Sequence, residues 1–448
     1  MEKIKQFIAL RTNPNRIGLR AYSINLYERF KRDSLFQNSV YLMLSTAIMA
    51  MFGFLFWIIA ARLYRPAEIG FATALISATI LLSNFAILGF NTALIRYLPK
   101  AGDRNSMINT ALAAVSAATL LIAGAYLLGL QQFAPTFKEL TSNLGYGALF
   151  LVFMVMVSIN TLTDSVFIAY RASKYNFIVY TCFGLTKIIL PLFLVGFGSY
   201  GIFFAYTGSV AVSLALSFYF MAKRLGWRAG LRIKKDVALQ MGKFSLANYV
   251  AAFLAGFPVL VMPTLIVQRL GAEQSAFYYM ASTIAGLLYI VPQATTQALF
   301  AEGAHNENEI VALVKSACKL IAALLLPAIL LFVVAGKYLL LVFGNDYAAN
   351  SLMPLQIMAI TAVGMAINLV GSAIMKVRSH ILSLVFVQAG YIGATMAFTY
   401  ALIGRGVIGV AWALLLGQVF VCLEYAAMFG WSKLRRLPAN PPNDSPVL

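Results

Sequence analysis

The residues best suited to chemistry are ionisable side chains that interrupt long apolar runs. Lys187 lies near the middle of the run 176–197, and Asp164 and Glu424 lie one to two turns from the ends of two other runs. A lysine at the centre of a membrane helix costs about 2.5–3.5 kcal/mol on insertion scales, so it needs a watery cavity or a carboxylate. Lys187 therefore predicts a contact with a substrate phosphate or a gating ion pair. A fixed structural pair with Asp164 is the alternative.

Four other charged residues are candidates for coupling or gating. Asp164 and Glu424 are candidate acceptors of a coupling proton, because desolvation favours a neutral carboxyl group; solvation at the mouth of a cavity is the alternative. Arg96 and Glu302 follow two runs in corresponding parts of the chain. They predict a closing gate, with ordinary loop charges as the other interpretation.

A second set of cations and polar groups suits an anionic sugar substrate. Three arginines stand at the outer ends of two corresponding runs, where they either attract a pyrophosphate or extend to the membrane interface. Tyrosine rings can stack on sugars and amides can bind them, although hydrogen bonds between helices explain many amides without a substrate. The candidates for substrate binding, beside Lys187, are Arg62, Arg65, Arg269, Tyr249, Tyr278, Gln293 and Gln297.

The composition requires a membrane to position these residues. The 448 residues are 61% hydrophobic and 11% charged, with a mean hydropathy of +0.82. Soluble domains are about 45–50% apolar and roughly 25% charged. The relevant unit is therefore the span of about 20 apolar residues that crosses a hydrocarbon core of about 30 Å.

Twelve such spans are predicted, in two groups of six. They divide the chain into a basic N-terminal segment (1–37), a first six-helix bundle (38–221), a basic linker (222–243), a second bundle (244–430) and a C-terminal tail (431–448). We therefore predict an all-α polytopic membrane protein. The predicted spans are 38–61, 70–90, 107–130, 144–169, 176–197, 201–221, 244–267, 276–299, 310–335, 352–375, 381–403 and 407–430.

The basic residues set the expected orientation. With the N-terminus inside, 25 of the 34 Lys and Arg residues fall on the cytoplasmic side and 6 on the other, as the positive-inside rule requires. Both termini are thus predicted to be cytoplasmic in a cell (inner or plasma) membrane. The same asymmetry explains the net charge of +19 without nucleic acid. The segment 16–35 is expected to form either a helix on the membrane surface or solvated coil.

Absences in the sequence argue against an enzyme. The chain has no GxxxxGK[ST] loop for ATP, and the three cysteines, all within apolar runs, have no metal-ligand spacing. The two histidines, His305 and His380, are isolated from each other. We therefore expect no metal and no cofactor, and transport driven by an ion gradient, the membrane potential or removal of the product.

The two groups of six resemble each other. The motif RLYRPAEIGF at 62–71 corresponds to RLGAEQSAF at 269–277, and TALI at 92–95 corresponds to QALF at 297–300. Because six is even, both halves cross the membrane in the same direction. Transporters built from such halves place the substrate site between them, near the midplane.

At these and neighbouring residues the chain resembles the polysaccharide and oligosaccharide flippases of the multidrug/oligosaccharidyl-lipid/polysaccharide exporter superfamily. The resemblance is carried by GFNTALIRY at 89–97, by the stretch 256–302 and by GKYLLLVFGNDY at 336–347. It implies two six-helix bundles forming a V around a central cavity, related by a pseudo-twofold axis. It also implies that the protein flips a polyprenyl-pyrophosphate-linked oligosaccharide by alternating access.

The resemblance implies partners and leaves two alternatives open. The partners would be the lipid-linked oligosaccharide, the bilayer, and the glycosyltransferases and polymerase of one pathway. A proton- or cation-coupled drug exporter of the same fold is one alternative; it would need an acidic cavity. A membrane-embedded glycan polymerase or ligase is the other; it would need a large outer loop with catalytic Arg or His, whereas the outer loops predicted here are short.

Overall fold

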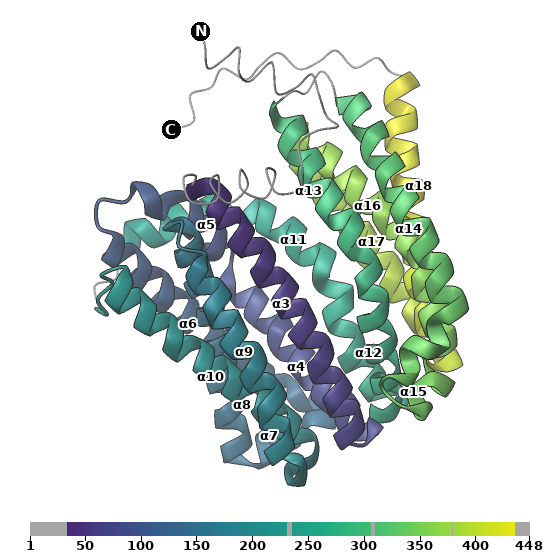
Figure 1. Cartoon of the computed structure of the whole chain (residues 1–448), viewed down its shortest axis with the longest axis horizontal. Helices are drawn as coiled ribbons and strands as arrows, with labels where there is room; N and C mark the ends of the chain where they lie inside the picture. The colour runs from purple at the N-terminus through teal and green to yellow at the C-terminus, as the bar shows by residue number, and fades with distance from the viewer. Residues whose placement is uncertain (1–33, 231–234, 306–309, 379, 435–448) are drawn as a thin grey trace, which may run out of the picture.

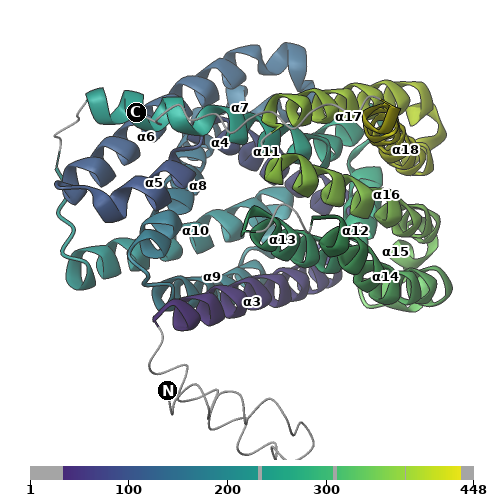
Figure 2. The same ribbon diagram turned by 90° about the horizontal axis from the view of Figure 1, so that it is seen from above.

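The computed structural model describes residues 34–230, 235–305, 310–378 and 380–434, and this part of the chain is helical without a strand. The predicted segment 1–37 therefore lies almost wholly outside the described residues, as does most of the tail. Figure 1 shows two groups of long helices that lie side by side, and Figure 2 shows the same groups from above. We call them the N-terminal lobe and the C-terminal lobe.

Each lobe contains six long helices or helix pairs with short elements between them. The N-terminal lobe contains α3 (Ser34–Leu63), α4 (Pro66–Ile87), α5 (Phe90–Tyr97), α6 (Arg104–Phe133), α7 (Glu139–Ser142), α8 (Leu144–Ala169), α9 (Lys174–Phe193) and α10 (Gly198–Arg224). The C-terminal lobe contains α11 (Lys235–Leu270), α12 (Ala272–Gly286), α13 (Ile290–His305), α14 (Ile310–Leu341), α15 (Asn345–Asn350), α16 (Leu352–Val377), α17 (Ile381–Leu402) and α18 (Gly406–Leu434).

The predicted twelve spans correspond to these helices. Ten described segments are long and apolar enough to cross a membrane; one of them, Leu382–Met428, holds both α17 and α18, and the apolar part of α11 is the shorter segment Gly256–Leu270. The all-α, two-lobe fold predicted from the sequence is therefore confirmed. Helices are required here because each backbone N–H and C=O in lipid must be satisfied within its own segment.

Several boundaries differ from the prediction, and two of the differences have a clear physical reason. The predicted linker 222–243 is shorter, because α10 continues to Arg224 and α11 begins at Lys235. The residues that follow α10 pack against α6. Trp227 Nε1 donates to Asn109 Oδ1 at 3.0 Å, and the Asn109 amide donates to the Arg228 carbonyl at 3.0 Å. The linker was predicted too long because hydropathy marks polar residues as lying outside a span. Polar residues at a helix end can still continue the helix or bind a neighbouring helix.

The second predicted span ends earlier than expected. The helix α4 stops at Ile87, and Leu88 and Gly89 adopt left-handed φ angles of 49° and 78° before α5 begins. Such angles are strained for a residue with a Cβ but accessible to glycine. The GFNTALIRY motif thus starts a separate short helix.

The lobes contact each other along α4, which packs against α11 and α12. We call the membrane side where α3 begins and α18 ends the basic side, since Lys223, Arg224 and Lys376 lie there. About two turns inside the opposite side, Trp57 of α3 meets Tyr279 of α12 with ring centroids 4.8 Å apart.

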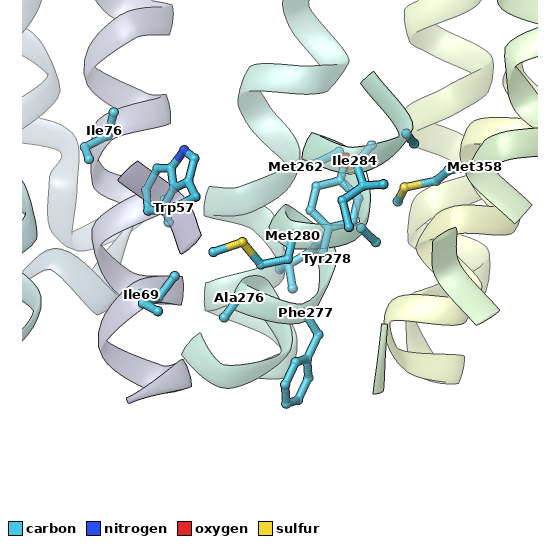
Figure 3. Close-up of a cluster of buried hydrophobic side chains, with 14 of the residues drawn as sticks. Trp57, Ile69, Ile76, Met262, Ala276, Phe277, Tyr278, Met280, Ile284 and Met358 are labelled. Atoms are coloured by element: carbon cyan, nitrogen blue, oxygen red, sulfur yellow. The ribbon is translucent and has the colours of Figure 1, made fainter. Parts of the chain in front are cut away.

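Trp57 belongs to a hydrophobic cluster that both lobes share. Figure 3 shows Trp57 and Ile69 of the N-terminal lobe in this cluster, together with Ala276 and Met280 of α12. All four side chains are buried. The lobes therefore share one core at the level of Trp57.

Contacts between the lobes are unequal on the two sides of the membrane. At its basic-side end α3 packs on its own lobe: the Ser173 N–H donates to Asn38 Oδ1 at 2.9 Å, and Tyr41 lies 6.0 Å from Phe177. Further along, α3 crosses to the other lobe through Phe54, whose ring lies 5.4 Å from that of Phe343. The arrangement is a V closed at the side opposite the basic one (Figure 1).

The closest approach of the lobes depends on a glycine. A Cβ at Gly70 would lie 1.6 Å from the carbonyl oxygen of Ala272 and 2.9 Å from the N of Ala276. These are backbone atoms of α12, which cannot move aside as a flexible side chain can.

We expect Gly70→Ala to destabilise the closed V by about 1–3 kcal/mol or more, because overpacking typically costs about that much and the atoms in contact here are rigid backbone atoms. Thermal unfolding of the purified protein measures the effect. Gly53→Ala is the matched control, since a Cβ there meets nothing within 4 Å; it should be neutral or stabilising by up to about 1 kcal/mol. Equal stability of both variants would contradict the close packing.

Candidate functional site

Lys187 is enclosed by aromatic rings. Its side chain, on α9, is 7% exposed, and Nζ lies 4.4 Å from the ring centroid of Phe56 and 4.5 Å from that of Tyr206. Phe183 and Trp57 complete the enclosure at 5.7 and 5.9 Å. We call Lys187 and these four rings the Lys187 cage. Aromatic faces attract a cation, by about 2 kcal/mol when it is desolvated.

Close packing of α3 on α9 brings the cage together. A Cβ at Gly184 would lie 2.1 Å from the ring of Phe52, so only glycine lets α3 approach α9 this closely. One turn further along each helix, Phe56 reaches Lys187. Three helices, α3, α9 and α10, supply the four rings.

The cage adjoins the shared core of the lobes, and it provides no counter-charge. Its Trp57 contacts Tyr279 of α12 in the other lobe. Asp164 does not pair with Lys187; its Oδ2 accepts a hydrogen bond from the Tyr180 hydroxyl at 2.7 Å. A desolvated ammonium stabilised only by ring faces retains strong attraction for an anion. The fixed ion pair with Asp164, weighed as an alternative, is absent from the described structure.

The three arginines predicted at the outer ends of spans make three different kinds of contact. Arg62 extends to the other lobe: Nη2 donates to the Leu341 carbonyl at 2.8 Å and to that of Val342 at 2.9 Å, and Nε donates to Val342 at 3.1 Å. The guanidinium thereby caps the last carbonyls of α14, where the helix dipole favours a cation. Arg62 is a tie between lobes in this conformation.

Arg65 and Arg269 stay within their own lobes. The Arg65 backbone N–H donates to Glu68 Oε2 at 2.9 Å, which caps the start of α4. The Arg269 guanidinium lies 5.9 Å from the ring of Tyr400 on α17. Both side chains are exposed, so they remain at the membrane interface on the side opposite the basic one.

The predicted sugar-binding residues lie in different surroundings. Tyr278 is 2% exposed in the shared core (Figure 3), so its ring is not available to a sugar in this conformation. The Tyr249 hydroxyl donates to the Asn84 carbonyl and so joins α11 to α4. Gln293 and Gln297 are exposed on one face of α13.

The four predicted coupling or gating residues are not brought together. Asp164 lies between α8 and α9, and Glu424 lies against Gly390 of α17. Asp164 Oδ1 and Glu424 Oε2 are buried without a hydrogen-bond partner. Arg96 lies 5.6 Å from the ring of Tyr97 on α5, and Glu302 is exposed on α13 in the other lobe.

Polar side chains of α16, α17 and α18 form a hydrogen-bonded network within the C-terminal lobe. Gln388 Nε2 donates to Asn368 Oδ1 at 3.0 Å and to Ser372 Oγ at 3.2 Å, and the hydroxyl groups of Ser372 and Tyr425 lie 3.2 Å apart. Gln418 Oε1 accepts from Asn368 at 3.5 Å. Hydrogen bonds of this kind hold membrane helices together, here α16, α17 and α18.

Sequence reasoning missed the cage rings. Phe56, Trp57, Phe183 and Tyr206 were not singled out, because an aromatic residue in an apolar span carries no signal by itself. The spacing of Phe183 and Lys187, four residues apart on one helix, is the one signal available, since such residues share a face. Among the described residues no group of three His, Cys, Asp or Glu is placed to hold a metal.

Comparison with known proteins identifies relatives by sequence and by fold. The model of the family described as "Polysaccharide biosynthesis protein" matches residues 35–262. No curated protein matches. Among solved structures, the fold is similar to the inward-facing conformation of a multidrug resistance MATE family transporter of the MOP superfamily. That similarity has a TM-score of 0.69 and 14% identity, over 90% of this chain and 100% of the other.

Two further structures give lower scores. The outward-facing conformation of a multidrug resistance MATE family transporter has a TM-score of 0.60 and 14% identity, over 90% of this chain and 95% of the other. A MOP superfamily transporter from Pyrococcus furiosus has a TM-score of 0.60 and 13% identity, with the same coverage; reverse polarity of its binding pocket suggests a different function for it. At these identities the likeness shows the fold alone.

Proposed function

The chain belongs to the family described as "Polysaccharide biosynthesis protein", and we propose that it is a membrane transporter of the MOP superfamily that flips a lipid-linked oligosaccharide. The substrate class is an oligosaccharide on a polyprenyl pyrophosphate. Its phosphates need a cation within a low-dielectric path, its sugars need hydrogen bonds and ring faces, and its polyprenyl tail can remain in lipid.

The observation that carries the proposal is the Lys187 cage. A cation with no carboxylate partner among the described residues is held at the core that both lobes share, enclosed by four aromatic rings. A phosphate reaching Lys187 gains an ion pair in a medium of low dielectric. A lysine kept at membrane depth at a cost of about 2.5–3.5 kcal/mol is expected to serve a function.

The closed side of the V supports a direction of transport. We assign the basic side to the cytoplasm, following the asymmetry of Lys and Arg, so both termini are cytoplasmic in the inner or plasma membrane. The present conformation, tied at the other side by Arg62, then receives substrate from the cytoplasm. Alternating access requires that tie to break. In this scheme glycosyltransferases deliver the substrate and a polymerase receives it.

Asp164 and Glu424 are the proposed coupling residues, since each has a buried oxygen without a partner. Neither lies between the lobes, which is where a drug exporter that binds cations would need acidic groups. Their placement thus disfavours that alternative.

A polymerase or ligase is disfavoured by the connections on the side opposite the basic one. The two longest of these are the described residues 134–143 between α6 and α8 and 342–351 between α14 and α16. The first holds the 3-10 helix Pro135–Phe137 and α7, the second holds α15, and neither contains Arg or His. Such connections offer little room for a catalytic loop.

The test is to delete the gene and identify what accumulates. A flippase of this class predicts a several-fold rise of one intact polyprenyl-linked oligosaccharide, located on the cytoplasmic leaflet, because synthesis continues while export stops. Restoring the gene should reverse the rise. Increased sensitivity to cationic drugs without any lipid-linked intermediate would overturn the proposal in favour of a drug exporter.

A further inference from the structure

An apolar groove lies in the C-terminal lobe, far from the Lys187 cage. It lies where α14 and α18 each pack against α16, and it has a volume of about 530 Å³. Residues of all three helices line it, among them Ile321 and Leu326 of α14, Val370 and Ile374 of α16, and Tyr425 of α18. Figures 1 and 2 show these helices together on the side of the molecule away from the N-terminal lobe.

Lysines on α14 fix the depth of the groove in the membrane. Lys319 and Lys337 are both exposed, and the residues between them are uncharged. They are separated by about 27 Å at 1.5 Å per residue, close to the hydrocarbon thickness of about 30 Å. Lys319 and Lys337 therefore mark the two headgroup regions, Lys319 on the basic side.

The groove spans one leaflet. Its wall on α14 extends from Cys318 to Leu326, about 12 Å of helix, and half of a hydrocarbon core is about 15 Å. The groove therefore begins at the headgroup level of the basic side and ends near the midplane. Its length matches one acyl chain of that leaflet.

Cations stand at the headgroup end of the groove. Lys315 and Lys319 are exposed and share a helical stripe with Ala322 and Leu326, which line the groove. Arg378 is exposed one turn beyond Ile374, at the corresponding end of α16. The site thus combines an apolar slot with a basic mouth, the complement of an anionic amphiphile.

We propose that this groove binds an anionic phospholipid from the leaflet on the basic side, with an acyl chain in the slot and the phosphate between Lys315, Lys319 and Arg378. The position favours a resident phospholipid over the transported substrate. The lobes meet along α3, α4, α11 and α12 and at the Leu341 end of α14, whereas the groove lies between α14, α16 and α18 at the other end of α14. Rocking of the lobes cannot carry a headgroup across from there. The inference does not depend on the proposed function.

The test measures lipid selectivity at the groove itself. Cys318 lines it and is exposed, so a bimane label is attached there in the Cys182→Ser, Cys422→Ser background. The labelled protein is reconstituted in phosphatidylcholine vesicles, and quenching is followed as either phosphatidylglycerol or phosphatidylcholine with brominated chains is added. We expect phosphatidylglycerol to be preferred roughly tenfold or more, since each basic residue near an anionic headgroup contributes about a fivefold factor.

Two variants and one control label separate the contributions. Lys315→Gln with Lys319→Gln should reduce the preference at least fivefold, and Ile367→Trp, which fills the slot, should reduce quenching by both lipids. A label on Leu121→Cys, an exposed position on α6, should show a ratio near one. Native mass spectrometry of the unlabelled protein should retain fewer phosphatidylglycerol molecules in the double-glutamine variant.

Equal quenching by both lipids at Cys318 would overturn the proposal. It would also be overturned if a polyprenyl phosphate displaced phosphatidylglycerol from the groove at equal concentration. In that case the groove would serve the substrate, and the accumulation experiment on the deleted gene would be unaffected.

Discussion

Lys187→Ala is expected to abolish glycan export while the protein remains inserted and folded. The variant removes the cation proposed to meet the substrate phosphate, and loss of one partner from a buried charge pair costs about 2–5 kcal/mol. Export should therefore fall at least about thirtyfold. A second expectation concerns stability. Lys187 is buried among aromatic rings and has no carboxylate partner among the described residues, so the folded protein gains little from its charge.

Replacing Lys187 should therefore abolish glycan export without lowering thermal stability. Removing the ammonium releases an insertion cost of about 2.5–3.5 kcal/mol and loses a cation–ring attraction of about 2 kcal/mol. We thus expect Lys187→Met, which keeps the chain length, to have equal or slightly higher thermal stability and no export. Surface glycan in a deletion strain measures export, and detergent-solubilised protein measures stability. Lys337→Met, at an exposed lysine, is the control and should export normally. Normal surface glycan with Lys187→Met would remove Lys187 from the mechanism.

Arg62→Ala should open the side of the V that is closed here. The variant loses three contacts between the guanidinium and the carbonyls that end α14. Hydrogen bonds from charged groups contribute about 1.5–3 kcal/mol when buried, and Arg62 is exposed, so we expect about 1–2 kcal/mol in total. That corresponds to a shift of about five- to thirtyfold toward the conformation open on that side.

Distances between spin labels report this shift. Labels at Lys138→Cys and Ala349→Cys, exposed positions of the two lobes, should show a larger population of long distances when Arg62 is replaced. Arg269→Ala is the matched control, because this arginine occupies the corresponding place in the other half but contacts Tyr400 of its own lobe. Identical distance distributions in all three proteins would show that Arg62 does not hold the lobes together.

The sequence by itself determined the membrane fold and the most costly residue in it. The length of an apolar run and the charges that flank it depend only on residues close together in the sequence. The twelve spans and the depth of Lys187 in the membrane could therefore be predicted from the sequence alone. The resemblance between the halves, carried by RLYRPAEIGF and RLGAEQSAF, is equally local. The family followed from the same short motifs.

Only the tertiary structure decided what each residue touches. Arg62 and Arg269 begin the same repeated motif, yet Arg62 caps α14 across the lobes whereas Arg269 lies over Tyr400. Tyr278 was predicted to bind sugars, but it lies buried in the core that the lobes share. The physical reason is that the depth of a residue in the bilayer is set by its own span, whereas its partners depend on how neighbouring helices rotate and pack. The rings around Lys187 come from three helices that meet because Gly184 admits Phe52.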